Sequence, residues 1–181
     1  LPIGAELLAI TAAVATAHAI TQSTKIIAKI KWPNDIILNG KKVAGILLES
    51  RIIDNKPVYV VGIGINCSQP TSFFENKKLQ MPATSIDIET ASHIDRNKLA
   101  TNLINAFYEQ LKNAAVRPNN IIDAWRSLST QLGRRITVKY DKKNFTGNCI
   151  GVDPVEGLIL QLEKGSVRMF HAAQTRIVKH T

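Results

Sequence analysis

The segment from Lys31 to Lys42 carries the residues of this chain that are best suited to chemistry. Lys31 and Asp35 stand on either side of Trp-Pro-Asn, and Lys42 follows the pair Asn39-Gly40. Asn-Gly between two apolar runs is a strong hairpin signal, because both residues accept positive φ. A tight hairpin that concentrates lysines and a carboxylate beside apolar strands suits a charged ligand. The segment therefore predicts a site for an anionic, phosphorylated ligand.

A second group of candidate binding residues follows an apolar run, where Gly62 and Gly64 precede Asn66. Glycines lack Cβ, so a ligand can approach the backbone of a strand that contains them. Asn66 can both donate and accept hydrogen bonds. Cys67 stands where a dinucleotide fingerprint needs its third glycine, and no P-loop motif is present. Nucleotide binding through either of those motifs is therefore excluded.

These residues belong to three blocks that resemble the biotin protein ligase family. The first block reads Lys-Trp-Pro-Asn-Asp at 31–35 and continues as Lys-Val-Ala-Gly-Ile-Leu-Leu-Glu at 42–49. The second reads Gly-Ile-Gly-Ile-Asn at 62–66, and the third reads Pro-Ala-Thr-Ser at 82–85, followed by Asp-Arg-Asn at 95–97. The resemblance covers nearly the whole chain, and the first block alone is specific.

The resemblance implies a two-step reaction. The carboxylate of biotin attacks the α-phosphate of ATP, which gives biotinyl-5′-AMP and pyrophosphate. A lysine of a biotin carboxyl carrier protein then takes the biotinyl group. Because the first step brings two anions together, positive charge aimed at the forming bond is its chief need.

The resemblance also implies a role for each candidate residue. Lys42 is the expected catalytic residue, in contact with the biotin carboxylate and the phosphate. Asp35 is expected near the phosphates, where it binds Mg²⁺ directly or through water. The other binding residues implied are Lys31 and Asn66 at the nucleotide, Gly45, Leu47, Gly62 and Ile65 along the biotin slot, and Gly64, where a ligand can approach the strand.

Other interpretations of the same residues are open on the sequence alone. Lys42 could be a solvated turn lysine, and Asp35 could cap the amides of its turn. Gly45 and Leu47 could belong to the core. Lys41 is expected on the opposite face of the strand from Lys42 and mostly solvated.

The chain predicts an α+β fold, in which a mixed β-sheet flanked by helices precedes a small SH3-like barrel. The fold should resemble that of class II synthetases, with residues 1–129 forming the C-terminal half of a catalytic domain and residues 130–181 forming the barrel. Residues 58–65 are a nearly continuous apolar run, which favours a strand buried on both faces. Residues 68–82 are expected to form an irregular loop. The predicted helices cover 4–20, 97–111 with Asp95 as its cap, and 119–128, and the remaining predicted strands cover 26–30, 36–38, 43–48, 135–140, 144–152, 157–162 and 166–170.

The composition of the chain does not favour a nucleic-acid binder, a metal site or a membrane segment. The chain has 181 residues and a formal net charge of +9, but no long basic run or aromatic-interleaved basic stripe of a nucleic-acid binder. Its two cysteines are far apart, which favours reduced thiols in the cytoplasm, and its four histidines lack metal-site spacing. The apolar N-terminal stretch lacks a preceding basic region, so an interior helix is expected rather than a membrane segment.

The chain also departs from the family pattern. It has no Gly-Arg-Gly-Arg loop ahead of its first helix, so we expect it to be the remainder of a longer protein and inactive alone. Near the C-terminus, Gln174 occupies the position where the family pattern has an acidic residue, and Arg176 is displaced from the position of the family's arginine. The contacts that the barrel makes to ATP in the family are therefore not expected to be the same here. The expected function is a biotin protein ligase. The alternatives are a bifunctional ligase and DNA-binding repressor if an upstream DNA-binding domain exists, a non-catalytic sensor, and a lipoate ligase; family members occur as monomers and as homodimers.

Overall fold

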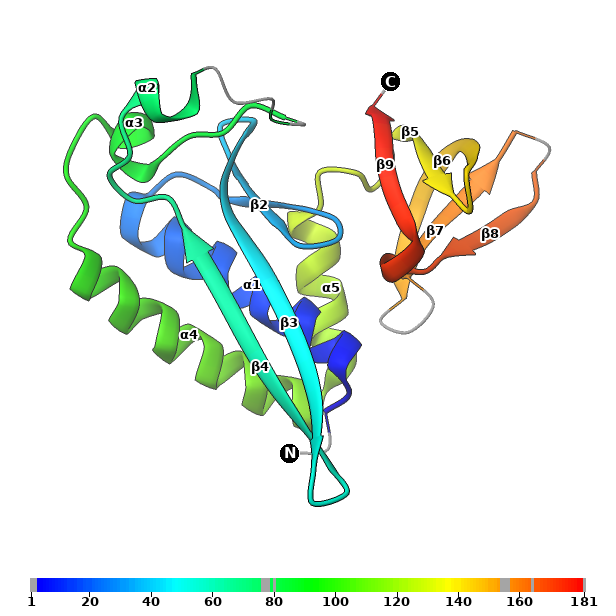
Figure 1. Ribbon diagram of the computed structural model, residues 1–181, viewed down its shortest axis with the longest axis horizontal. Helices are drawn as coiled ribbons and strands as arrows, with labels where there is room; N and C mark the ends of the chain where they lie inside the picture. The colour runs from blue at the N-terminus through cyan, green and yellow to red at the C-terminus, as the bar shows by residue number, and fades with distance from the viewer. Residues whose placement is uncertain (1–2, 76–78, 80, 154–156, 164, 181) are drawn as a thin grey trace.

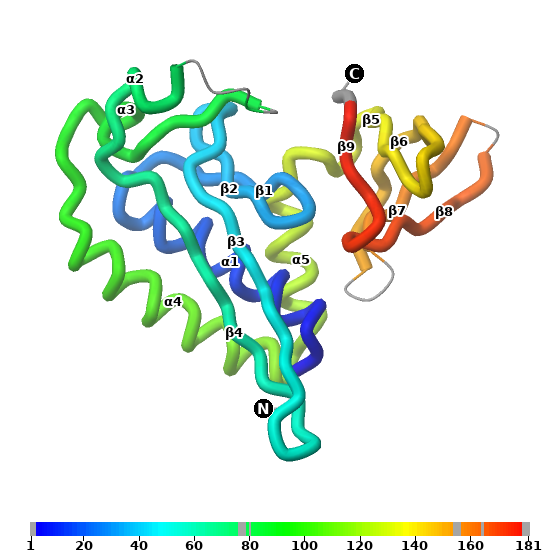
Figure 2. The backbone as a smooth tube through the Cα atoms, in the orientation of Figure 1, coloured from blue at the N-terminus to red at the C-terminus, as the bar shows by residue number. Residues whose placement is uncertain are grey.

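The computed structural model describes residues 3–75, 79, 81–153, 157–163 and 165–180. Two antiparallel sheets form the framework, and the helices gather around the first of them (Figure 1). The sheets lie side by side, with the helices on the side of the first sheet (Figure 2). The first part of the chain contains α1 (Ala5–Thr24), β1 (Lys29–Lys31), β2 (Asp35–Leu38), β3 (Lys41–Ile53), β4 (Lys56–Ile65), α2 (Thr71–Phe74), α3 (Ile86–Thr90), α4 (Arg96–Val116) and α5 (Pro118–Leu128).

The first sheet has the strand order β1-β2-β3-β4 and is antiparallel at every pairing. The expectation of a mixed sheet is therefore wrong for the described residues. Each pair of neighbouring strands is joined by a short turn, and a short turn can only join antiparallel strands. The β2–β3 turn is the predicted one, with Asn39 at φ 47° and Gly40 at φ 80°.

Strand β4 forms an edge of the sheet, so the expectation that this apolar run is buried on both faces is also wrong. Val58 and Val60 are exposed. β-branched residues favour a strand whether or not it is covered, so the run predicted the strand correctly and its burial incorrectly.

Helix α1 packs against one face of the first sheet, and α4 and α5 pack against α1. Ala12, Ala13 and Ala17 are buried, and their small side chains let the neighbouring elements approach closely. The buried hydroxyl of Thr16 donates to the carbonyl of Ala12 at 2.7 Å, so no hydrogen bond is lost inside this layer. Trp125 of α5 is buried in the same core.

The second sheet consists of β5 (Arg135–Tyr140), β6 (Lys143–Asp153), β7 (Gly157–Leu162), β8 (Val167–Phe170) and β9 (Thr175–His180), in the order β8-β7-β6-β5-β9. A single 3-10 turn, Ala172–Gln174, joins β8 to β9. The sequence did not predict β9. The strands form a sheet of defined order, and among the described residues β8 and β9 are not paired with each other.

Several other boundaries differ from the sequence predictions. Strand β1 begins at Lys29 rather than at residue 26, and Ile27 is exposed. The predicted loop at 68–82 contains α2, and its residues 76–78 and 80 lie outside the described part. The predicted cap of α4 is confirmed, since Asp95 accepts from the amides of Asn97 and Lys98. Among the described residues, none of the helices combines the length and the hydrophobicity needed to cross a membrane.

Candidate functional site

A single row of residues runs across all four strands of the first sheet. Lys31 lies opposite Asp35, Asp35 opposite Gly45, and Gly45 opposite Gly64. Residues directly opposite each other in antiparallel strands share a face of the sheet. The row therefore brings four of the predicted site residues onto one face: a cation, a carboxylate and two glycines.

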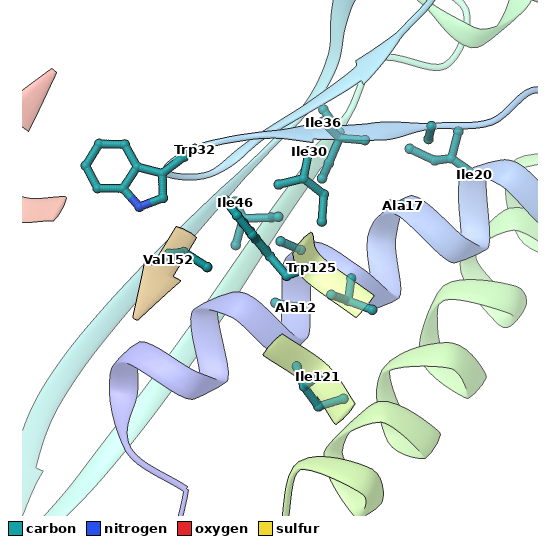
Figure 3. Close-up of a cluster of buried hydrophobic side chains, with 14 of the residues drawn as sticks. Ala12, Ala17, Ile20, Ile30, Trp32, Ile36, Ile46, Ile121, Trp125 and Val152 are labelled. Atoms are coloured by element: carbon teal, nitrogen blue, oxygen red, sulfur yellow. The ribbon is translucent and has the colours of Figure 1, made fainter. Parts of the chain in front are cut away.

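The same face carries the residues on either side of this row. Leu47 lies opposite Gly62, and Lys29 lies opposite Ile37, which in turn lies opposite Lys42. The other face is apolar: Ile30, Ile36 and Ile46 point from the sheet toward α1 (Figure 3). The helices therefore cover one face only, and the charged face, which we call the open face, points away from them.

Lys42 and Asp35 form an ion pair over Gly45. The side chains of Lys42 and Asp35 are 40% and 17% exposed, so the pair remains accessible. A Cβ at position 45 would lie 3.3 Å from the Lys42 Nζ. Glycine at this position therefore leaves the space that the lysine side chain occupies. Asp35 contacts a lysine rather than the amides of its own turn.

The turn before Asp35 is held by two anchors. The Trp32 amide donates to the Gln131 Oε1 at 3.1 Å, and the Trp32 side chain is only 5% exposed, which fits a packing role. Asn34 exchanges two hydrogen bonds with the backbone of Ile46 on β3, at 2.7 and 2.9 Å. These contacts fix both ends of the Trp-Pro-Asn segment, whose Trp32–Pro33 peptide is cis.

The third sequence block lies against the first two. The Lys42 amide donates to the Pro82 carbonyl, and the Thr84 amide donates to the Lys42 carbonyl, both at 2.9 Å. Asn66 donates through its Nδ2 to the Thr84 carbonyl at 3.0 Å, and its amide donates to the Val43 carbonyl at 2.8 Å. Asn66 therefore fixes the backbone on either side of Lys42, and all three blocks meet at one place.

Glu89 on α3 is a member of this region that the sequence did not predict. Its side chain is 7% exposed and accepts from Thr84, Asn39 and Lys41 at 2.6, 2.8 and 3.0 Å. Burial opposes ionisation of this carboxyl, but the hydrogen bonds outweigh burial, and the pKa of Glu89 lies below its ordinary value. Lys41 is therefore tied to a buried carboxylate, although its own side chain is 45% exposed, and the sequence did not predict this partner.

Two further residues predicted along the biotin slot, Ile65 and Leu47, lie on opposite faces of the sheet. Ile65 lies opposite Ala44 and packs against the helix-covered core, so its side chain is on the other face from Gly45 and Leu47. Leu47 is on the open face with 61% of its surface exposed, so it is not a core residue.

The cysteine beside the second block does not have the character of a nucleophile. Cys67 is half-buried and free, and burial raises the pKa of its thiol. Burial raises the pKa of Cys149, also free, to about 11. A reactive cysteine needs a lowered pKa, so neither thiol is a candidate for covalent catalysis. In the described part of the chain, no three His, Cys, Asp or Glu residues gather as a metal site would require.

Comparisons with known proteins agree with the blocks and with the fold. Residues 3–66 match the model of the biotin/lipoate A/B protein ligase family. The bifunctional ligase/repressor BirA of Bacillus subtilis is 30% identical over 169 residues, which cover 91% of this chain and 51% of that protein. The biotin–[acetyl-CoA-carboxylase] ligase of Paracoccus denitrificans is 34% identical over 138 residues, covering 73% of this chain and 56% of that protein.

Among solved structures, the biotin protein ligase of Aquifex aeolicus in complex with biotin and ATP has the same fold. Its TM-score is 0.81 at 21% identity, and the match covers 100% of this chain and 74% of that one. The chain spans about half the length of the curated relatives that it matches. The sequence blocks, the matched relatives and the shared fold together show that the chain belongs to the biotin protein ligase family.

Proposed function

We propose that the protein is an ATP-dependent biotin protein ligase, which forms biotinyl-5′-AMP and transfers biotin to a lysine of a biotin carboxyl carrier protein. The observation that carries this proposal is the Lys42–Asp35 pair over Gly45, in a row that ends at Lys31. The row places positive charge beside a strand surface that lacks side chains, where two anionic substrates can meet. The relatives named as biotin ligases support the same activity.

In the first step, a carboxylate oxygen of biotin forms a bond to the α-phosphorus of ATP. The bond from that phosphorus to the bridging oxygen breaks, and its electron pair leaves with pyrophosphate. Lys42 is the catalytic residue, because its ammonium can contact the carboxylate and the phosphate and so stabilises the charge that builds up between them. Lys31 binds the phosphates from the β1 end of the row.

Mg²⁺ fits this site through Asp35. Mg²⁺ is usually bound by one or two carboxylates together with phosphate oxygens and water. Asp35 is the carboxylate of the row and is partly exposed. It would hold the ion next to the phosphates, and the ion would neutralise phosphate charge.

Biotin is proposed to lie on the open face along Gly45, Leu47, Gly62 and Gly64, where three glycines leave a shallow track beside an exposed leucine. Ile65 supports this track from the other face rather than lining it. Asn66 is proposed to contact the nucleotide while it holds the segment around Thr84. In the second step, the carrier lysine attacks the acyl carbon of biotinyl-5′-AMP, and AMP leaves.

The finer points of organisation are part of the same proposal. Residues 1–129 belong to the catalytic domain, and residues 130–181 form an SH3-like barrel. The order β8-β7-β6-β5-β9 and the 3-10 turn before β9 support the barrel. The two free cysteines support a cytoplasmic location.

A combined ligase and repressor is the second candidate, supported by the similarity to the Bacillus subtilis protein of that description. The two candidates share the ligase step and differ in DNA binding. A helix-turn-helix in the full-length gene product, with biotin-dependent binding to promoter DNA, would establish the second role.

The test is a biotinylation assay with the full-length gene product, ATP, Mg²⁺, biotin and a biotin carboxyl carrier domain. We expect biotinyl-adenylate and pyrophosphate without the acceptor, and labelled acceptor lysine when it is added. Lipoate in place of biotin is the control and should not be transferred. Transfer of lipoate but not biotin, or no adenylate at all, would overturn the proposal.

A further inference from the structure

A second cationic feature lies where the open face of the first sheet meets the second sheet. A cleft of ≈ 730 Å³ lies between β1 and β2 on one side and the start of the second sheet on the other. Figure 1 shows β9 on the side of the second sheet that faces the first. The residues that matter in the lining are Lys29, Lys31, Ile37, Arg134, Ile177 and Val178.

The charge of this cleft is one-sided, because its described lining contains Lys29, Lys31 and Arg134 but no Asp or Glu. Lys29 donates through its Nζ to the Ser127 carbonyl at 3.4 Å, and Lys31 donates to the Met81 sulfur at 3.5 Å. Within the described residues, none of the three cations has a carboxylate at ion-pair distance. Three cations without counter-charge favour an anion in the cleft.

The cleft continues the row of the proposed active site. Lys31 ends that row and also lines the cleft. Ile37 lies opposite Lys42 on one side and opposite Lys29 on the other. Lys42 and Lys29 are thus two strand spacings apart, roughly 10 Å. A phosphate chain that starts at Lys42 can therefore extend over β2 toward β1 and into the cleft.

The cation that the second sheet contributes is Arg134 rather than Arg176. Arg176 lines a separate cleft with Lys139 and Asp141. Arg134 lies directly before β5, close to the point where the Thr130 amide donates to the Ile30 carbonyl of β1 at 2.9 Å. This backbone contact fixes the start of the second sheet next to the first.

We propose that this cleft binds the β- and γ-phosphates of the nucleoside triphosphate and then the pyrophosphate that they become. Lys29 and Arg134 are its phosphate-binding residues, with Lys31 shared between the cleft and the active site. They act on the leaving group: when the bond from the α-phosphorus to the bridging oxygen breaks, the electron pair leaves on pyrophosphate, whose charge these cations neutralise. This inference rests on the proposed function and adds the path of the leaving group.

The test is calorimetric titration of the full-length gene product with sodium pyrophosphate, ATP, AMP and biotin. Lys29→Gln and Arg134→Gln should each lower the affinity for pyrophosphate and for ATP by about tenfold or more, since each removes a charge-assisted hydrogen bond. AMP and biotin should bind as in the unmodified protein, because neither reaches the cleft. Lys29→Arg, which keeps the charge, should restore most of the lost affinity.

Lys139→Gln is the matched control, because Lys139 is an exposed cation of β5 that faces the other cleft. An equal loss in this control would mean that net charge alone attracts the anion, and it would overturn the site. Unchanged pyrophosphate affinity in both cleft variants would overturn it as well, even if biotinyl-adenylate still forms. Pyrophosphate binding that depends on Lys29 and Arg134 without any adenylate formation would retain the anion site and reject the ligase.

Discussion

Arg168 of the second sheet and the lysines Lys29 and Lys31 of the first sheet have different kinds of partner. In the second sheet, the Arg168 guanidinium lies 4.3 Å from the ring centre of Phe145, and 5.3 and 5.4 Å from those of Tyr140 and Phe170. On the open face of the first sheet, the partners of Lys29 and Lys31 are a backbone carbonyl and a thioether sulfur at long distances. The guanidinium of Arg168 therefore stacks against aromatic rings of its own sheet. The ammonium groups of the two lysines keep hydrogen-bond donors available for a ligand.

The difference separates structural cations from binding cations on physical grounds. A cation that already faces three rings gains little from a ligand and contributes to packing. A lysine whose hydrogen bonds are long, as those of Lys29 and Lys31 are, binds an anion at a small cost in lost interactions. The adjacent residues Lys41 and Lys42 repeat the contrast, since Lys41 is held by buried Glu89 and Lys42 by the more accessible Asp35.

Lys42→Ala should have the largest effect on activity. We expect biotinyl-adenylate formation to fall by roughly a hundredfold or more, because removal of one stabiliser of developing charge costs about 10²–10³ in rate. Pyrophosphate release in single turnover is the measurement. Lys41→Ala is the matched control and should lower stability more than rate. Equal rates for the two variants would contradict the distinction between the two lysines.

Substitution of a glycine by alanine should affect stability in the second sheet and activity in the first. Gly157 has φ +89°, and a Cβ there would collide with the Phe170 carbonyl, so Gly157→Ala should destabilise the protein by at least about 1–3 kcal/mol. In Gly45→Ala the nearest atoms belong to the flexible end of Lys42, and Asp35 Oδ1 is at an ordinary 4.0 Å, so stability should hold while adenylate formation falls by roughly tenfold. Urea unfolding measures the stability of both variants, and the single-turnover rate measures their adenylate formation. A Gly45→Ala protein that is destabilised as much as Gly157→Ala would contradict this assignment.

The sequence predicted most of the strands of the first sheet and the hairpin that carries several residues of the proposed site. Asn39-Gly40 specifies the β2–β3 turn, which places Ile37 opposite Lys42. A shift of register between Ile36 and Ile37, which the turn does not specify, then places Asp35 opposite Gly45. The face on which Ile65 lies also follows from the local pattern. Side chains alternate along a strand, so Ile65 must face away from Gly62 and Gly64.

What the sequence could not predict is non-local. Glu89 lies on a helix of five residues, too short to leave a periodic signal, and its importance comes from partners about 50 residues earlier. Arg134 lines the same cleft as Lys29 only because the second sheet begins beside β1. Strand β9 pairs with β5 although β6, β7 and β8 lie between them in the chain, and no turn signal marks that pairing.

Asp35→Asn should separate metal binding from turn stabilisation. An amide keeps one acceptor oxygen but loses the charge that Mg²⁺ prefers, so the Mg²⁺ requirement of adenylate formation should rise several-fold while biotin affinity is retained. Titration of the rate with Mg²⁺, beside calorimetry with biotin, measures both. If Asp35 only supports its turn, asparagine replaces it well and the Mg²⁺ dependence does not move.

Glu89→Gln should change how stability depends on pH. The pKa of Glu89 is lowered from 4.5 in the folded protein, so its contribution is present above that pH and is lost as the pH falls through the folded value. The melting temperature of the unmodified protein should therefore drop more steeply below pH 4.5 than that of the variant. Glu109→Gln, at an exposed pair with Lys112, is the control and should leave the slope unchanged.

Arg168→Gln should have the smallest effect and the most informative sign. The guanidinium lies over three rings but is exposed, and exposed cation–π contacts contribute about 0.5–1 kcal/mol. We expect the free energy of unfolding to fall by about that amount, with unchanged affinity for pyrophosphate and unchanged adenylate formation. Lys29→Gln should show the reverse, a loss of pyrophosphate affinity with little loss of stability. If Arg168→Gln lowers the affinity for pyrophosphate as much as Lys29→Gln does, cations stacked on aromatic rings and cations with available donors are not distinct. The assignment of the cleft depends on that distinction and would then be contradicted.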